Sequence, residues 1–77
     1  MWQIDKIIEV ANQLQRTGST GASTGERIAA AFVLNKQEFL PRNYNDMVEA
    51  WDRLDQDWQD YVRIVKREFM HEIIEAD

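Results

Sequence analysis

The chain has 77 residues, a formal net charge of −5 at pH 7 and no cysteine. This length suits one small domain over residues 1–77, and hydrophobic residues at 44% suffice for a core, which argues against a disordered chain. Without cysteine, neither disulfides nor a thiolate-bound metal can hold the fold together. The negative charge repels nucleic acid and anionic membranes and attracts basic surfaces.

The sequence predicts neither a membrane-spanning helix nor a signal peptide. No apolar stretch approaches the roughly 18 residues of a membrane-spanning helix. Residues 1–10 carry charges within their apolar run, which a signal peptide keeps uncharged. We therefore expect a soluble cytoplasmic protein with no membrane partner.

Apolar residues at helical spacing predict a first helix over residues 2–16. Its apolar face consists of Ile4, Ile7, Ile8, Ala11 and Leu14. Gly18 is expected to end this helix, because glycine readily takes the left-handed backbone conformation that closes helices.

A second helix is predicted to start after Ser23 and to run to Leu34. Ser23 and Glu26 have the spacing of a capping box, in which each side chain accepts a hydrogen bond from the other residue's backbone amide. Residues 28–34 are apolar nearly all round, so this helix must be covered on most sides. We expect it at the centre of a compact all-α bundle of about four helices.

The segment between these two helices holds all three glycines, Gly18, Gly21 and Gly25, among serines and threonines. A P-loop places Lys and Ser or Thr after its last glycine, whereas Gly25 precedes Glu26, whose carboxylate repels phosphate. A dinucleotide-binding loop follows a strand of a parallel sheet, and the sequence predicts no strand. We therefore interpret the segment as a joint between helices.

The middle of the chain interrupts the helical pattern. Pro41 disfavours helical geometry at Leu40, so Phe39 and Leu40 are expected to form a short turn that covers the core. Asn45 is the expected N-cap of the next helix.

From Met47 onward, apolar residues recur mostly at alternating steps of four and three, which is typical of a helix packed along a heptad seam. These residues are Met47, Trp51, Leu54, Trp58, Tyr61, Val65, Phe69 and Ile73. A single helix over 46–75 would be about 45 Å long, too long for so small a domain. We predict a break near residues 55–57 with Asp55 as N-cap, and one continuous helix is the alternative.

Candidate catalytic and metal-binding residues are few. Glu68, His71, Glu72 and Glu75 have helical spacing and include the Glu-x-x-His pattern of di-iron bundles. Such bundles need a second copy of that pattern and glutamates from two more helices, and His71 is the only histidine. Hydroxyl groups cluster over residues 17–24, far in sequence from His71, so no nucleophile–base pair is apparent. We expect no metal, no cofactor and no enzymatic activity.

Basic residues group at Arg63, Lys66 and Arg67, which is a candidate nucleic-acid patch. An acidic chain lacks the basic excess that attracts phosphate, so nucleic acid is a disfavoured partner and a small DNA-binding regulator is our third hypothesis.

Acidic side chains are the stronger candidates for binding. Asp46, Glu49, Asp57 and Asp60 are expected to form a row along one side of the third and fourth helices, with Asp52 and Asp55 beside it. The row is either an ordinary solvated face or a surface that docks on a basic partner. The candidate partner-binding residues are Asp46, Glu49, Asp52, Asp57 and Asp60.

The leading hypothesis is a non-enzymatic protein–protein interaction module, an inhibitor or adaptor that docks on a basic protein. The second is an inhibitor of the kind that phages or plasmids encode, which occupies a nucleic-acid-binding surface of its target by mimicking DNA. Trp51 and Trp58 share one helical stripe, which is typical of a core but also of interface centres, so self-association into a homodimer is a further alternative.

Overall fold

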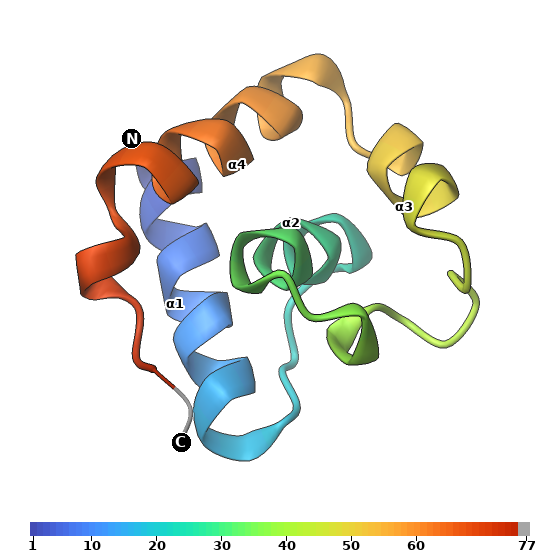
Figure 1. The fold of residues 1–77 in the computed structure, drawn as a ribbon, viewed down its shortest axis with the longest axis horizontal. Helices are drawn as coiled ribbons and strands as arrows, with labels where there is room; N and C mark the ends of the chain where they lie inside the picture. The colour runs from blue at the N-terminus through green and yellow to red at the C-terminus, as the bar shows by residue number, and fades with distance from the viewer. Residues whose placement is uncertain (76–77) are drawn as a thin grey trace.

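The computed structural model describes residues 1–75 as an all-α bundle (Figure 1). Its elements are α1 (Trp2–Thr17), α2 (Thr24–Leu34), the short 3-10 helix η1 (Gln37–Phe39), α3 (Met47–Arg53), α4 (Gln56–Glu68) and a second 3-10 helix, η2 (Met70–Glu72). No strand occurs within these residues. The radius of gyration is 11.1 Å, close to the roughly 11.5 Å of a compact domain of this length. The predicted fold class is confirmed.

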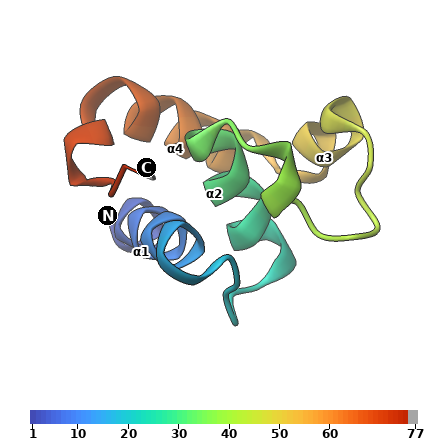
Figure 2. The same ribbon diagram turned by 60° about the horizontal axis from the view of Figure 1, so that its bottom comes forward.

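Helix α2 lies at the centre of the bundle, as its apolar sequence predicts. It contacts α1, η1, α3 and α4, and Figures 1 and 2 show it enclosed by these elements from two directions. Its buried residues are Ile28, Ala29, Ala30, Ala31 and Val33. The three small alanine side chains allow the neighbouring helices to pack close to the α2 backbone.

The joint between α1 and α2 is built as the sequence indicates. Gly18 ends α1 in the left-handed conformation, with φ 76°, and its amide donates to the Leu14 carbonyl at 2.8 Å. Ser23 and Glu26 form the complete capping box of α2. The Glu26 amide donates to Ser23 Oγ at 3.3 Å, and the Ser23 amide donates to Glu26 Oε1 at 3.1 Å.

The predicted break between the third and fourth helices is present. Leu54 takes an extended conformation after α3, and Asp55 caps α4 by accepting a hydrogen bond from the Trp58 amide at 3.0 Å. All eight seam residues are buried or half-buried against the core despite the break. The heptad spacing therefore identified the inward side chains, although it runs across two helices.

Two predicted boundaries in this region are wrong. The N-cap of α3 is Asp46, not Asn45, because the Asp46 carboxylate accepts from the amides of both Val48 and Glu49. The final helix does not reach residue 75 but ends at Glu68. Beyond η2, the chain turns back along α1 as the return segment, residues 73–75.

Side chains of α1 hold the return segment in place. Asn12 donates to the Glu72 carbonyl at 3.1 Å and accepts from the Ile74 amide at 2.8 Å, while Gln15 donates to the Ile74 carbonyl at 2.9 Å. Ile73 is buried as a result. These contacts satisfy backbone groups that a continued helix would have bonded internally.

Candidate functional site

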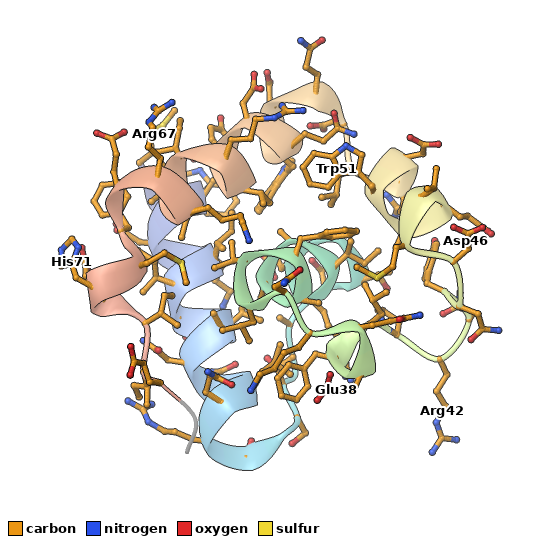
Figure 3. The ribbon with its side chains drawn as sticks, in the orientation of Figure 1. Glu38, Arg42, Asp46, Trp51, Arg67 and His71 are labelled. Carbon is orange, nitrogen blue, oxygen red and sulfur yellow. The ribbon has the colours of Figure 1, made fainter. Side chains whose placement is uncertain are left out.

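The acidic segment, residues 46–60, spans α3 and the first part of α4. It contains six carboxylates and one basic residue, Arg53, so its formal charge equals that of the whole chain. All six carboxylate residues are exposed. Figure 3 places Asp46, the first carboxylate of this segment, at the edge of the molecule opposite His71 and Arg67.

Two of the five predicted binding residues also have intramolecular partners. Asp46 is the N-cap of α3, and Asp60 forms an ion pair with Arg63 at 2.8 Å. Both side chains therefore make contacts within the domain that a binding partner would have to share or replace. The sixth carboxylate of the segment, Asp55, is likewise a helix cap.

The other three predicted residues, Glu49, Asp52 and Asp57, have free carboxylates. Within residues 1–75, none of these side chains takes part in an ion pair or a hydrogen bond. Glu49 and Asp57 lie in the first turns of α3 and α4, where a negative charge is favourable, but all three carboxylates remain open to an external cation. These three residues form the part of the acidic segment that is best suited to binding.

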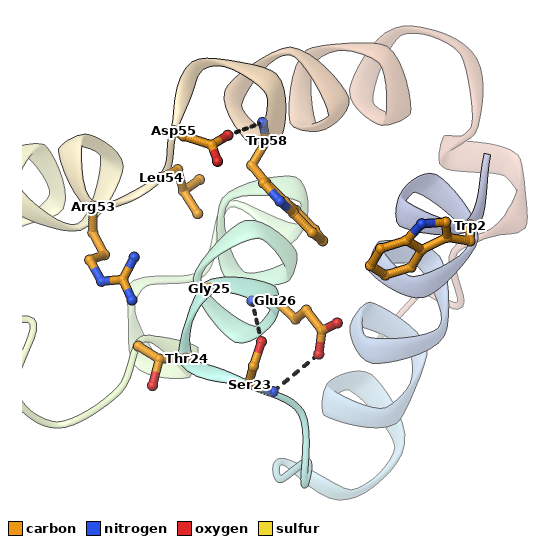
Figure 4. Close-up of a pocket in the computed structure, with 9 residues that line it drawn as sticks. All are labelled: Trp2, Ser23, Thr24, Gly25, Glu26, Arg53, Leu54, Asp55 and Trp58. Atoms are coloured by element: carbon orange, nitrogen blue, oxygen red, sulfur yellow. Dashed lines mark hydrogen bonds between the residues drawn. The ribbon is translucent and has the colours of Figure 1, made fainter.

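A groove opens at the middle of the acidic segment, where α3 meets α4. This Trp2–Trp58 groove has a volume of about 490 Å³ and lies between the start of α1, the start of α2 and the α3–α4 junction (Figure 4). Its lining residues are Trp2, Ser23, Thr24, Gly25, Glu26, Arg53, Leu54, Asp55 and Trp58. It combines aromatic walls with charged side chains, as ligand-binding grooves commonly do.

The two indoles of this groove lie next to each other. The ring centroids of Trp2 and Trp58 are 6.2 Å apart in an edge-to-face arrangement. Trp2 keeps 64% of its surface exposed, which is a large fraction for a tryptophan in so small a domain. The apolar face predicted for the first helix does not include Trp2. Its absence from that face, together with the size of the side chain, is the signal in the sequence that could have identified it.

A second, smaller groove of about 330 Å³ lies between α2, α3 and α4. Phe32 and Trp51 form an edge-to-face pair in it, with ring centroids 5.0 Å apart. The Arg63 guanidinium lies over the Trp51 ring, and Lys66 donates to the Phe32 carbonyl at 3.1 Å. Arg67 pairs with Glu68, so all three residues of the predicted basic group have intramolecular contacts.

The predicted metal pattern is not assembled into a cluster. His71 is exposed, stacks against Phe69 and lies 3.7 Å from Glu72, while Glu68 pairs with Arg67. Among residues 1–75, no group of three His, Cys, Asp or Glu side chains has metal-binding geometry.

The hydroxyl groups of Thr17 and Thr20 bind to the joint and to the end of α1. Thr17 bonds to the Gln13 and Ser19 carbonyls, and the Thr20 hydroxyl donates to the Gln13 side chain. These bonds support our interpretation of the segment as a connection between α1 and α2.

Comparisons with protein-family models, curated proteins and solved structures find no match for this chain. Within residues 1–75, no helix is both long enough and apolar enough to span a membrane. The functional argument therefore depends on the charges and grooves of the molecule itself.

Proposed function

We propose that the protein is a non-enzymatic interaction module that docks its acidic segment on a basic protein in the cytoplasm. The observation that carries this proposal is the set of free, exposed carboxylates of Glu49, Asp52 and Asp57, in a segment with a formal charge of −5. A concentrated charge of one sign steers an oppositely charged partner and raises the association rate by about 10- to 1,000-fold. Inhibitors and adaptors both use such a surface.

Occupation of a nucleic-acid-binding site is a special case of this proposal. A protein surface that binds phosphates is rich in Lys and Arg, and the exposed carboxylates of the acidic segment match its charge. Competition between this protein and nucleic acid for the captured partner distinguishes this inhibitor from an adaptor that binds elsewhere on a basic protein.

The experiment uses the chain as bait in a native lysate, identifies the captured protein and then measures association rates with that purified partner. Glu49→Lys and Asp57→Lys together should slow association about tenfold or more at 0.1 M salt and change dissociation less. Glu38→Lys is the matched control, because Glu38 is exposed on η1 outside the acidic segment.

Salt provides a second test. The Debye length falls from about 10 Å at 0.1 M salt to about 3 Å at 1 M, so the difference between the double variant and the control should largely vanish at 1 M. Association rates that respond neither to charge reversal nor to salt contradict the proposal. Such rates would indicate docking through an apolar surface.

A further inference from the structure

The Trp2–Trp58 groove has a lining that selects a particular kind of ligand. Trp2, Trp58 and Leu54 supply aromatic and aliphatic surface, while Glu26 and Asp55 supply carboxylates. Lysine and arginine combine an apolar stem with a cationic head, and their heads are attracted to the faces of indole rings. Such a side chain matches both parts of this lining.

We infer that the groove receives a lysine or arginine side chain of the basic partner, an inference that rests on the proposed function. The stem packs against the indoles of Trp2 and Trp58, and the charge lies near Glu26 and Asp55. A volume of about 490 Å³ exceeds a single side chain, so the occupant is a short basic segment anchored by that residue. Leu54 and Asp55 belong to both the groove and the acidic segment, so the two surfaces are continuous.

The same lining disfavours an anion. Three helices, α1, α2 and α4, begin at the groove, and helix starts attract negative charge. At the starts of α2 and α4 the chain's own carboxylates already accept hydrogen bonds: Glu26 accepts from the Ser23 amide, and Asp55 accepts from the Trp58 amide. Figure 4 shows both bonds at the edge of the groove. The carboxylates of Glu26 and Asp55 would repel an anionic ligand.

Arg53 is the cationic side chain that lines the groove. Its removal should strengthen or weaken ligand binding according to the charge of the ligand, and this makes the inference testable. Within residues 1–75, Arg53 forms no ion pair and no hydrogen bond. If the ligand is a cation, Arg53 opposes it, and removal of the arginine strengthens binding. If the ligand is an anion, the same removal weakens binding.

The experiment titrates the ¹⁵N-labelled full chain with a short peptide of arginine, lysine and leucine, and then with a counterpart that has glutamate at the basic positions. The indole N–H signals of the three tryptophans report the binding site. The basic peptide should shift the Trp2 and Trp58 signals most, and Trp51, which lies outside the groove, serves as the internal control.

Two charge variants and a control complete the test. Arg53→Gln should tighten the basic peptide about two- to fivefold, and Asp55→Asn should weaken it by a similar factor, as expected for exposed charge pairs. Asparagine is as good an N-cap as aspartate, so Asp55→Asn preserves the start of α4. Glu38→Gln should leave the affinity unchanged.

The outcomes separate this inference from the proposed function. A basic peptide that binds in a salt-dependent way but shifts the Trp51 signal alone overturns the groove and leaves the acidic docking surface in place. If the glutamate peptide shifts the Trp2 and Trp58 signals, the ligand is an anion and the inference is wrong. If these signals shift with protein concentration alone, the groove binds a second copy of the chain and the inference is likewise wrong. Binding of neither peptide overturns the groove inference, while the proposed function is decided separately by the association rates with the captured partner.

Discussion

Capping residues determine where each major helix after the joint begins. Ser23, Asp46 and Asp55 each accept a hydrogen bond from a backbone amide in the first turn of their helix. The first four amides of a helix have no internal acceptor, so each such bond satisfies a group that would otherwise depend on water. In a domain this small, one cap represents a substantial share of the net stability.

The Ser23 cap gives a prediction at this scale. Ser23→Ala should lower the free energy of unfolding by about 0.5–2 kcal/mol, because it removes the acceptor of the Glu26 amide. Thr24→Ala is the matched control, since Thr24 is the exposed first residue of α2 and its own side chain does not cap the helix; its effect should stay within about 0.5 kcal/mol. Urea unfolding of the two variants measures the difference. Equal midpoints would mean that the capping box does not stabilise α2.

At the scale of helices, boundaries set by a local signal were predicted better than the one boundary set by distant packing. The starts of α2 and α4 follow from Ser23 and Asp55, because a cap acts within three residues of sequence. The end of α4 at Glu68 depends on the packing that follows it, and this involves Asn12, about 60 residues away in sequence. No local pattern in residues 46–75 carries that information. The error at Asn45 has a different cause. Asn45 and Asp46 are adjacent and both residue types cap helices, so the sequence alone does not show which of them is the N-cap of α3.

The candidate site was predictable in part for the same reason. The acidic segment is contiguous in sequence, so its exposed carboxylates were identifiable as a group. The groove beside it brings Trp2 next to Trp58 and places the start of α2 against the α3–α4 junction. These contacts depend on how the helices pack, and sequence periodicity does not specify which helix ends meet.

The central position of α2 gives a prediction for two of its apolar residues. Ile28 is fully buried, so Ile28→Ala should lower the free energy of unfolding by about 2–5 kcal/mol. Phe32 is half-buried beside Trp51, so Phe32→Ala should cost less than the roughly 3–5 kcal/mol of a fully buried phenylalanine. Urea unfolding, monitored by circular dichroism, measures the free energy of unfolding of both variants and shows which substitution costs more. A cost for Ile28→Ala well below about 2 kcal/mol would contradict the central role of α2.

Across the whole molecule, the negative charge has two separate roles. Some carboxylates hold the fold together: Asp46 and Asp55 cap helices, and Glu26 completes the capping box. Others, represented by Glu49 and Asp57, have no intramolecular partner within residues 1–75. A binding surface made from the second group can change its charge without loss of the fold.

This separation gives the last prediction, which compares two acids of the same segment. Asp46→Ala should lower the free energy of unfolding by about 0.5–2 kcal/mol, because the amides of Val48 and Glu49 lose their acceptor. Glu49→Lys should change it by less than about 0.5 kcal/mol, since exposed surface charges contribute little to stability. Two contributions to this small change oppose each other: the lysine reduces repulsion within a segment of formal charge −5, but Glu49 lies in the first turn of α3, where a negative charge is favourable.

Urea unfolding of both variants at low and high salt is the measurement. Salt should shrink the small effect of Glu49→Lys by screening, while the cost of Asp46→Ala should persist, because a hydrogen bond at a helix start is lost at any ionic strength. If Glu49→Lys destabilises the protein as much as Asp46→Ala, the acidic segment is a structural feature of the fold. The proposed separation between carboxylates that stabilise the fold and carboxylates that serve docking would then be wrong.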